Sequence, residues 1–378
     1  MDDASTGFET SPERKPPTDG VALCLSGGGF RAMLFHLGPI IRLNQLGMLP
    51  TLTCVSSVSG GSITAAVLGM NWTKLTFDSE HRATNLAELL IDPIFAFAGV
   101  NVDVPAILAG LLLPGRTIAD GVSSSYKKHL FGKLTLQDLP DDSAGPRFVI
   151  DATSVQTGKL FRFSRPYQGE YTVGLWRNPT TRLAEAVTAS SAFPPVMSPH
   201  VMKPSGTFDP TTAGVNAHGG FLKKHSLADG GVYDNLGLQP ALAAAHTVLV
   251  SDAGGALRAD AKQPHDWVRH GMRVTDLIDD QVRARRKIEL IKSYDSGELA
   301  GTFWGINSSI AAYHLADALT FARTDPAYPG NVKTRLTTLE PQVRKDLIRW
   351  GYVIADTAVR THLKPGTPPP AAADIPFA

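Results

Sequence analysis

Residues 21–70 read VALCLSGGGFRAMLFHLGPIIRLNQLGMLPTLTCVSSVSGGSITAAVLGM. The apolar run 21–25 predicts a buried strand that ends in a glycine turn. Residues 31–47 carry apolar side chains mostly three and four positions apart, which predicts a helix. A second strand is predicted at 52–55 and a second helix at 63–70. This alternation of strand, turn and helix indicates a parallel α/β architecture.

The same patterns predict further elements along the chain. These are strands at 147–153, 160–163 and 247–251, and helices at 183–192, 276–294 and 341–363. The second half of the chain is therefore expected to add strands to the sheet first and helices afterwards.

The domain organisation follows from where the periodic patterns begin and end. Residues 1–19 and the Pro/Ala-rich residues 364–378 have no periodic apolar pattern, so they are predicted to be tails. We expect a core at 20–260, interrupted by an apolar insertion at about 85–125. A helical C-terminal layer at 261–363 is expected to pack on this core.

Composition limits the classes of function. The chain has 378 residues, and 36 Lys and Arg against 35 Asp and Glu give a net charge of +1. This balance gives no reason to expect a nucleic-acid partner. Two cysteines, Cys24 and Cys54, are too few for a disulfide framework, and both lie in apolar runs. We therefore expect buried thiols and a cytoplasmic location, and the polar residues 1–20 predict no signal peptide.

One apolar stretch, at 94–113, is long enough to be weighed as a membrane span. It carries Asp103 and Pro105 near its middle, and a central Asp costs about 2.5–3.5 kcal/mol on insertion scales. A packed helical insertion or an apolar lid is therefore expected in place of a span.

The segment Ser57-Val58-Ser59-Gly60-Gly61 lies between a predicted strand and a predicted helix. A nucleophilic serine needs a tight turn of this kind, with small neighbours that let the backbone bend. Ser59 would then lie at a helix N-terminus, which favours developing negative charge. An ordinary Ser/Gly turn is the alternative for this segment taken alone.

The glycine turn before it offers backbone donors at the same edge of the sheet. Successive N–H groups of Gly27, Gly28 and Gly29 can form an anion-binding nest, and Arg31 adds a charge nearby. A dinucleotide site would need an acidic residue about 20 positions later. Because residues 21–77 contain no Asp or Glu, that alternative is excluded.

A carboxylate is offered by Asp229, within HSLADGGVYDNLGLQP at 225–240. An Asp before two glycines can approach another loop closely, although bare Asp-Gly pairs are common turns. Asp252, in SDAGG, is expected to be structural.

Four motifs in this order resemble those of patatin-like phospholipases: GGGFR, SVSGG, ASSAFPP at 189–195 and DGGVYDN. The resemblance covers about 20–240 and implies a three-layer α/β/α fold with a mainly parallel central sheet. It also implies lipid acyl hydrolase activity through a Ser–Asp dyad, with Ser59 as nucleophile and Asp229 as its partner. By position, Gly27, Gly28 and Gly29 match the oxyanion loop and Arg31 the basic residue after it. Ser57 departs from the family pattern, which has glycine there.

The expected chemistry needs neither a metal nor a cofactor. Asp229 would take the proton of Ser59 during attack on an ester, and N–H groups of Gly28, Gly29 and Gly60 would hold the oxyanion. Partial burial should raise the pKa of Asp229 and make it a better base. A Ser–His–Asp triad is the alternative, and His246 would be its candidate histidine. We expect His246 to be packed or solvent-facing, and His36 to be structural.

The apolar insertion is the expected lipid-contacting part. Two phenylalanines and a leucine run could line an acyl pocket or touch a bilayer, namely Phe95, Phe97, Leu111, Leu112 and Leu113. A packed insertion without lipid contact is the alternative. The basic cluster Arg283, Arg285, Arg286 and Lys287 is expected to be a solvated helix face.

The sequence thus predicts a serine lipid acyl hydrolase of the phospholipase A type. Its expected partners are a phospholipid or related lipid ester and, transiently, a membrane surface at which it acts peripherally. The alternatives are an acyltransferase that uses the same acyl-enzyme, and a degenerate lipid-binding module. The resemblance adds a third, because some bacterial members of the family are membrane-degrading effectors activated by a signal. The oligomeric state does not follow from the sequence.

Overall fold

The computed structural model describes residues 18–103, 117–195, 197–257, 259–263, 265–322 and 328–377. Eleven strands form one sheet in these residues. They are β1 (Thr18–Leu25), β2 (Leu52–Val58), β3 (Arg147–Ser154), β4 (Leu160–Phe163), β5 (Tyr167–Glu170), β6 (Gly174–Arg177), β7 (His200–Met202), β8 (Thr207–Asp209), β9 (His225–Asp229), β10 (Ala245–Asp252) and β11 (Ala300–Gly305).

The centre of the sheet is parallel. Strands β11, β10, β1, β2 and β3 follow one another in this order, and each neighbouring pair is parallel. Beyond β3 the sheet continues as antiparallel strands β4, β5, β6 and β8, and β9 pairs antiparallel with β3 and β7. The predicted α/β class with a parallel centre is confirmed, and the antiparallel extension adds to it.

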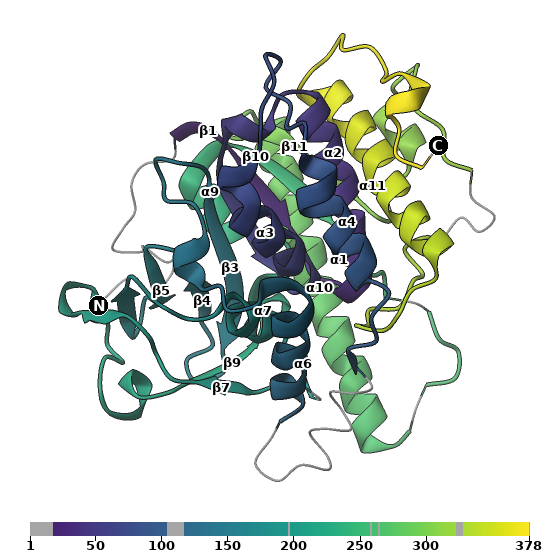
Figure 1. Ribbon diagram of the computed structural model, residues 1–378. Coiled ribbons are helices and arrows are strands. Elements are labelled where there is room, and N and C mark those ends of the chain that lie inside the picture. Colours follow the sequence, from purple (N-terminus) through teal and green to yellow (C-terminus); the bar gives the residue numbers. More distant parts are fainter. Residues whose placement is uncertain are drawn as a thin grey trace.

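Helices lie on both faces of this sheet (Figure 1). They are α1 (Gly29–Phe35), α2 (Leu37–Gln45), α3 (Gly60–Asn71), α4 (Asp92–Phe97), α6 (Ile118–Tyr126), α7 (Leu183–Ser190), α8 (Gly231–Asp234), α9 (Leu238–Ala244), α10 (Trp267–Asp295) and α11 (Pro341–His362).

The alternation of side chains along β1 explains the three layers. Leu23 and Leu25 pack into the larger core with helices α1, α2, α3, α7 and α11. Ala22 and Cys24 point the other way, into a smaller core with α9 and α10. Because both faces of the strand are buried, its sequence is a continuous apolar run. Cys24 and Cys54 are buried free thiols, as predicted.

Two elements differ from the sequence prediction. The single helix expected at 31–47 is divided at His36 into α1 and α2. Pro39 explains the division, because it has no N–H to donate to the carbonyl of Phe35. The segment 261–363, expected to be helical, also contributes strand β11, which pairs with β10 at the edge of the sheet.

The insertion packs into the body of the protein. Phe97 is almost completely buried, with its ring centroid 5.2 Å from that of Phe30. Phe95 packs against Phe377 and under the guanidinium of Arg344. Leu111, Leu112 and Leu113 lie outside the described residues. Within the described ranges, no helix combines the length and the apolar character needed to cross a bilayer.

Candidate active site

Strand register brings Ser59 and Asp229 together. Along one edge of β3, β2 ends with Val58 opposite Asp151, and β9, running the other way, ends with Asp229 opposite Ala152. The other edge of β3 is occupied by β4. Strands β2 and β9 therefore pair with the same edge of β3, and their C-terminal ends meet there. Ser59 is the next residue after β2, so it comes to lie beside Asp229.

Ser59 has the backbone of a nucleophile turn. Its φ of 51° and ψ of −118° are strained for a residue with a side chain, and it forms the N-cap of α3. Gly60 makes this turn possible, because a Cβ there would stand 2.1 Å from the carbonyl oxygen of Gly29. The two loops predicted to act together are thus in direct contact.

Three backbone donors remain available at this contact. Within the described part of the chain, the N–H groups of Gly28, Gly29 and Gly60 have no hydrogen-bond partner. Gly28 and Gly29 have φ values of 145° and 60°, which glycine adopts readily. Gly27 differs from the expectation, because its N–H donates to the carbonyl of Asn235 at 3.1 Å. The three free N–H groups are therefore those expected to hold the oxyanion, and Gly27 is not one of them.

Asp229 is held firmly and is poised to accept a proton. Its Oδ1 accepts the N–H of Gly231 at 2.7 Å, and its own N–H donates to the carbonyl of Ala192 at 2.9 Å. Burial, with a smaller contribution from the charge of Asp279, raises the pKa of Asp229 to about 7. The N–H of Gly231 and the hydroxyl of Ser59 favour the carboxylate and oppose part of this rise.

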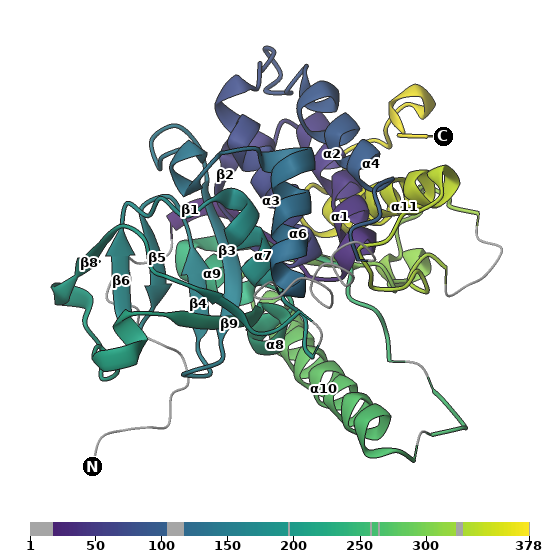
Figure 2. The same ribbon diagram turned by 60° about the horizontal axis from the view of Figure 1, so that its bottom comes forward.

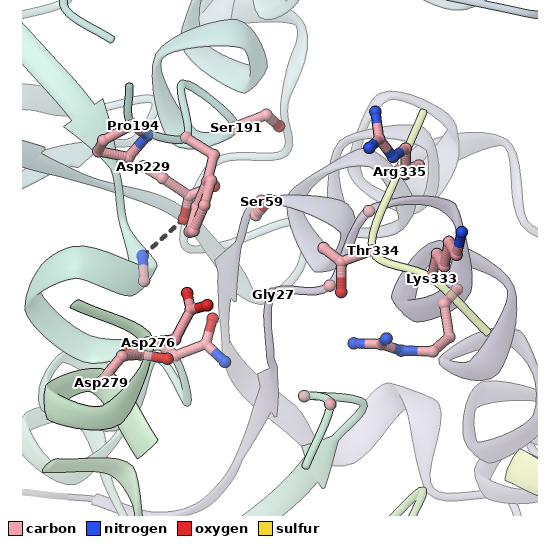
Figure 3. Close-up of a pocket in the computed structure, with 18 of the residues that line it drawn as sticks. Gly27, Ser59, Ser191, Pro194, Asp229, Asp276, Asp279, Lys333, Thr334 and Arg335 are labelled. Carbon is pink, nitrogen blue, oxygen red and sulfur yellow. Dashed lines mark hydrogen bonds between the residues drawn. The ribbon is translucent and has the colours of Figure 1, made fainter. Parts of the chain in front are cut away.

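Both residues line a cavity of about 700 Å³. Figure 3 shows Ser59 between two walls, with Asp229, Pro194, Asp276 and Asp279 on one side and residues 333–335 on the other. Asp276 and Asp279 come from α10, and residues 333–335 precede α11. Neither segment belongs to the motifs that predicted the site, so these walls could not be predicted from the sequence.

Arg31 lines the cavity and links two segments around it. It is buried, and its Nε donates to the carbonyl of Ala253 at 2.9 Å while its Nη1 donates to that of Val332 at 2.7 Å. Its charge lies beside the glycine loop, since a Cβ at Gly28 would stand 2.9 Å from its Nη2. Arg31 also ties the residues before 333–335 to the end of β10. Phe30 adds a second tie, with its N–H donating to the carbonyl of Arg335 at 3.0 Å.

Three other polar residues, which were expected to be structural or solvent-facing, have positions of these kinds. His36 is buried between the Oγ of Ser251 at 2.8 Å and the carbonyl of Ser26 at 2.9 Å, and burial lowers its pKa to about 4. His246 is exposed at the start of β10. Asp252 forms an ion pair with Lys287, which with Arg283 outweighs burial and lowers the pKa of Asp252.

The motif ASSAFPP has a role that the sequence did not reveal. Ser190, fully buried at the end of α7, accepts the N–H of Ser59 at 2.9 Å and donates to the carbonyl of Asp151 at 2.6 Å. Its own carbonyl accepts the N–H of Gly230 at 3.2 Å. Since Ala192 holds Asp229, one short segment fixes the backbone of both members of the pair.

Ser57, which departs from the family pattern, is part of the same buried network. The hydroxyl of Ser62 donates to that of Ser57 at 3.1 Å and lies 2.9 Å from the hydroxyl of Ser190. Ser57 in turn donates to the carbonyl of Val149 at 3.1 Å. The extra hydroxyl is therefore satisfied, and it links the turn to β3.

Replacing Ser190 by alanine tests this positioning role. We expect kcat to fall about tenfold with little change in KM, because small displacements of a nucleophile are costly. Thr188→Val is the matched control, since it removes another buried hydroxyl of α7, which bonds to the carbonyl of Ala184 in its own helix. Equal losses of kcat in both variants would show that Ser190 matters only for folding.

The site belongs to a region with known relatives. The patatin-like phospholipase family model matches residues 23–242. Human GIVD cytosolic phospholipase A2 has a similar structure, with a TM-score of 0.51 and 13% identity. The similarity covers 90% of this chain and 58% of the human chain, so this chain spans less than two thirds of that relative.

A second similar structure is VipD from Legionella pneumophila, with a TM-score of 0.37 and 17% identity over 92% of this chain and 68% of that one. No curated protein matches the sequence. At 13% identity, the human structure indicates the fold alone.

Proposed function

Because this chain belongs to the patatin-like phospholipase family, we propose that it is a serine lipid acyl hydrolase of the phospholipase A type. The observation that carries the proposal is the meeting of Ser59 with Asp229 beside three free backbone donors. A cavity of about 700 Å³ at this point is large enough for part of a lipid. The buried thiols of Cys24 and Cys54 favour action in the cytoplasm, at the surface of a membrane.

The first half of the reaction would transfer the acyl group to the protein. The Oγ of Ser59 attacks the ester carbonyl carbon while Asp229 takes the hydroxyl proton. The carbonyl oxygen becomes an oxyanion, which the N–H groups of Gly28, Gly29 and Gly60 hold. The bond to the leaving alcohol then breaks, and Asp229 returns its proton to that alcohol.

The second half would release the fatty acid. Water attacks the acyl-enzyme while Asp229 again accepts a proton, and the same donors hold the second oxyanion. The bond between the acyl carbon and Ser59 Oγ breaks, and the proton on Asp229 restores the hydroxyl. Both steps use one general base, so a histidine is not needed.

Product analysis tests the reaction class. With mixed phospholipid vesicles, we expect free fatty acid and lysophospholipid in equal amounts, measured by mass spectrometry. An added long-chain alcohol should change this outcome little. If the acyl chains moved to the alcohol and little free acid formed, the protein would be an acyltransferase working through the same acyl-enzyme.

A further inference from the structure

One part of the active-site cavity is apolar and suits an acyl chain. Ile118 and Val122 of α6 line it, as does Met197, which follows α7. Figures 1 and 2 show α6 beside α7. An apolar lining of this kind accommodates hydrocarbon. The expected insertion thus contributes to the cavity through α6, whereas Phe97 is in the core.

Charged side chains line two other walls, and their signs are separated. Asp276 and Asp279 lie on one side of Ser59, and Lys333 and Arg335 lie on the other (Figure 3). All four side chains are exposed. Within the described part of the chain, none of the four takes part in an ion pair. The cavity therefore has an acidic wall and a basic wall with unpaired charges on both.

The other charged residues of the cavity, apart from the catalytic base, already have partners. Asp280 pairs with Arg283 at 3.2 Å, and Asp103 accepts a backbone N–H at 3.1 Å. Arg31 donates to two backbone carbonyls, and Arg273 also has a partner. The charges that remain for a ligand are therefore two carboxylates and two cations.

Both charged walls are anchored to the rest of the protein. The carbonyl of Arg335 accepts the N–H of Phe30 at 3.0 Å, which holds the basic wall at the glycine loop. On α10, Arg286 donates to the carbonyl of Tyr233 at 3.0 Å. Because these contacts fix the two backbones, the opposite charges stay apart. A ligand that carries one negative and one positive group would satisfy both walls.

A buried hydroxyl in the same cavity also calls for a ligand. Ser191 lines the cavity and is 5% exposed, and its Oγ makes no hydrogen bond of normal geometry to a described residue. The hydroxyl of Tyr126 lies near it and is equally without such a bond. A buried hydroxyl without a partner costs free energy. An oxygen of the substrate, such as that of an ester, would give Ser191 the missing partner.

We propose that the headgroup site, defined as Asp276, Asp279, Lys333 and Arg335, selects phospholipids whose headgroup carries an amine, such as phosphatidylethanolamine. The inference rests on the proposed function and names its substrate class. Lys333 and Arg335 hold the phosphate, and the two carboxylates hold the ammonium group. Phosphatidylglycerol has the same phosphate but no ammonium, so it leaves both carboxylates unpaired near an added negative charge.

Monomeric lipids test this selection without a membrane surface. We would compare dihexanoyl phosphatidylethanolamine with dihexanoyl phosphatidylglycerol at pH 8, below the concentrations at which they form micelles. Both lipids carry the same ester, so the ratio of their kcat/KM values reports the headgroup alone. We expect wild type to prefer the ethanolamine lipid at least about tenfold.

The decisive variant is Asp276→Lys, which puts a cation on the acidic wall and leaves Asp279 beside Asp229. We expect the ratio to move toward phosphatidylglycerol at least about tenfold. Asp295→Lys is the matched control, because it makes the same charge change at the exposed end of α10, away from the cavity. Its ratio should stay at the wild-type value.

The basic wall is tested with Lys333→Ala/Arg335→Ala. We expect kcat/KM for both phospholipids to fall about tenfold relative to that for dihexanoylglycerol, which has the ester but no phosphate. An equal loss on all three substrates would show that the two cations support the fold of the site and hold no phosphate.

Other outcomes would also overturn the proposal. They are equal kcat/KM values for the two phospholipids in wild type, a ratio that Asp276→Lys and Asp295→Lys change alike, and cleavage of dihexanoylglycerol alone. In the last case the hydrolase would stand without the headgroup site.

Binding separates this inference from the proposed function. Ser59→Ala is titrated with the two phospholipids by calorimetry, and we expect tighter binding of the ethanolamine lipid. If wild type cleaved no ester while this preference remained, the hydrolase function would fail and the headgroup site would stand. Absence of the preference would overturn the headgroup site.

Discussion

Replacing Ser59 by alanine is expected to lower fatty-acid release from phospholipid vesicles by about 10⁴-fold, to the level that oriented donors alone provide. Asp229→Asn should have an effect of similar size, because the amide cannot accept the proton of Ser59. The two losses should not add in the double variant, since both residues serve one step. Rates are measured with purified protein that retains the thermal unfolding transition of wild type.

The control for this experiment is His246→Ala. His246 is exposed at the start of β10, so its removal should leave the rate at the wild-type value. A large loss in this variant would revive a triad with histidine as the base. Activity that survives Ser59→Ala would show that another residue is the nucleophile.

The second large effect is expected in the dependence of the rate on pH. Asp229 acts as a base only when it is deprotonated, and its pKa is raised to about 7 by burial. Below that value the neutral acid predominates, so kcat/KM should fall about tenfold for each pH unit and about 100-fold by pH 5. An ordinary aspartate, with a pKa of about 3.9, would leave the rate on its plateau at pH 5.

Asp279→Asn separates this titration from general effects of acid. The charge of Asp279 raises the pKa of Asp229, so its removal should move the acidic limb to lower pH. Asp276→Asn, on the same face of α10, is the matched control and should move the limb less. An acidic limb that stays in place in the Asp279 variant would contradict the assignment of the limb to Asp229, and a limb near pH 4 in wild type would contradict the raised pKa.

The local part of the site was predictable because it is written in short patterns. The turn around Ser59 needs a strand before it, a helix after it and glycine where another loop touches, and all three are visible in the sequence. Gly60 shows why, since a Cβ there would meet the backbone of Gly29. Asp229 could be chosen because the segment DGGVYDN resembles a motif of the family, whereas a bare Asp-Gly pair is more often a turn.

Other features of the site depend on which surface covers a residue, and the sequence leaves them open. Phe97 has the same apolar character whether it faces a lipid or a core, and only the packing of α4 against Phe30 and Tyr126 places it inside. Arg31 follows the glycine loop as expected, yet two backbone carbonyls take up its guanidinium. The N–H of Gly27 was expected to be free for an anion, but in the fold it donates to the carbonyl of Asn235.

By itself the sequence determined the α/β architecture, the nucleophile turn and the identity of the two catalytic candidates, because side-chain period and glycine placement act over a few residues. The tertiary structure alone decided that β9 pairs with the same edge of β3 as β2, beginning where the pairing with β2 ends. This pairing brings Ser59 and Asp229 together. The tertiary structure also decided that Ser190 and Ala192 fix the backbones of Ser59 and Asp229, and that α10 walls the cavity. Strand pairing and the burial of one segment by another join residues far apart in the chain, and no local pattern encodes those partners.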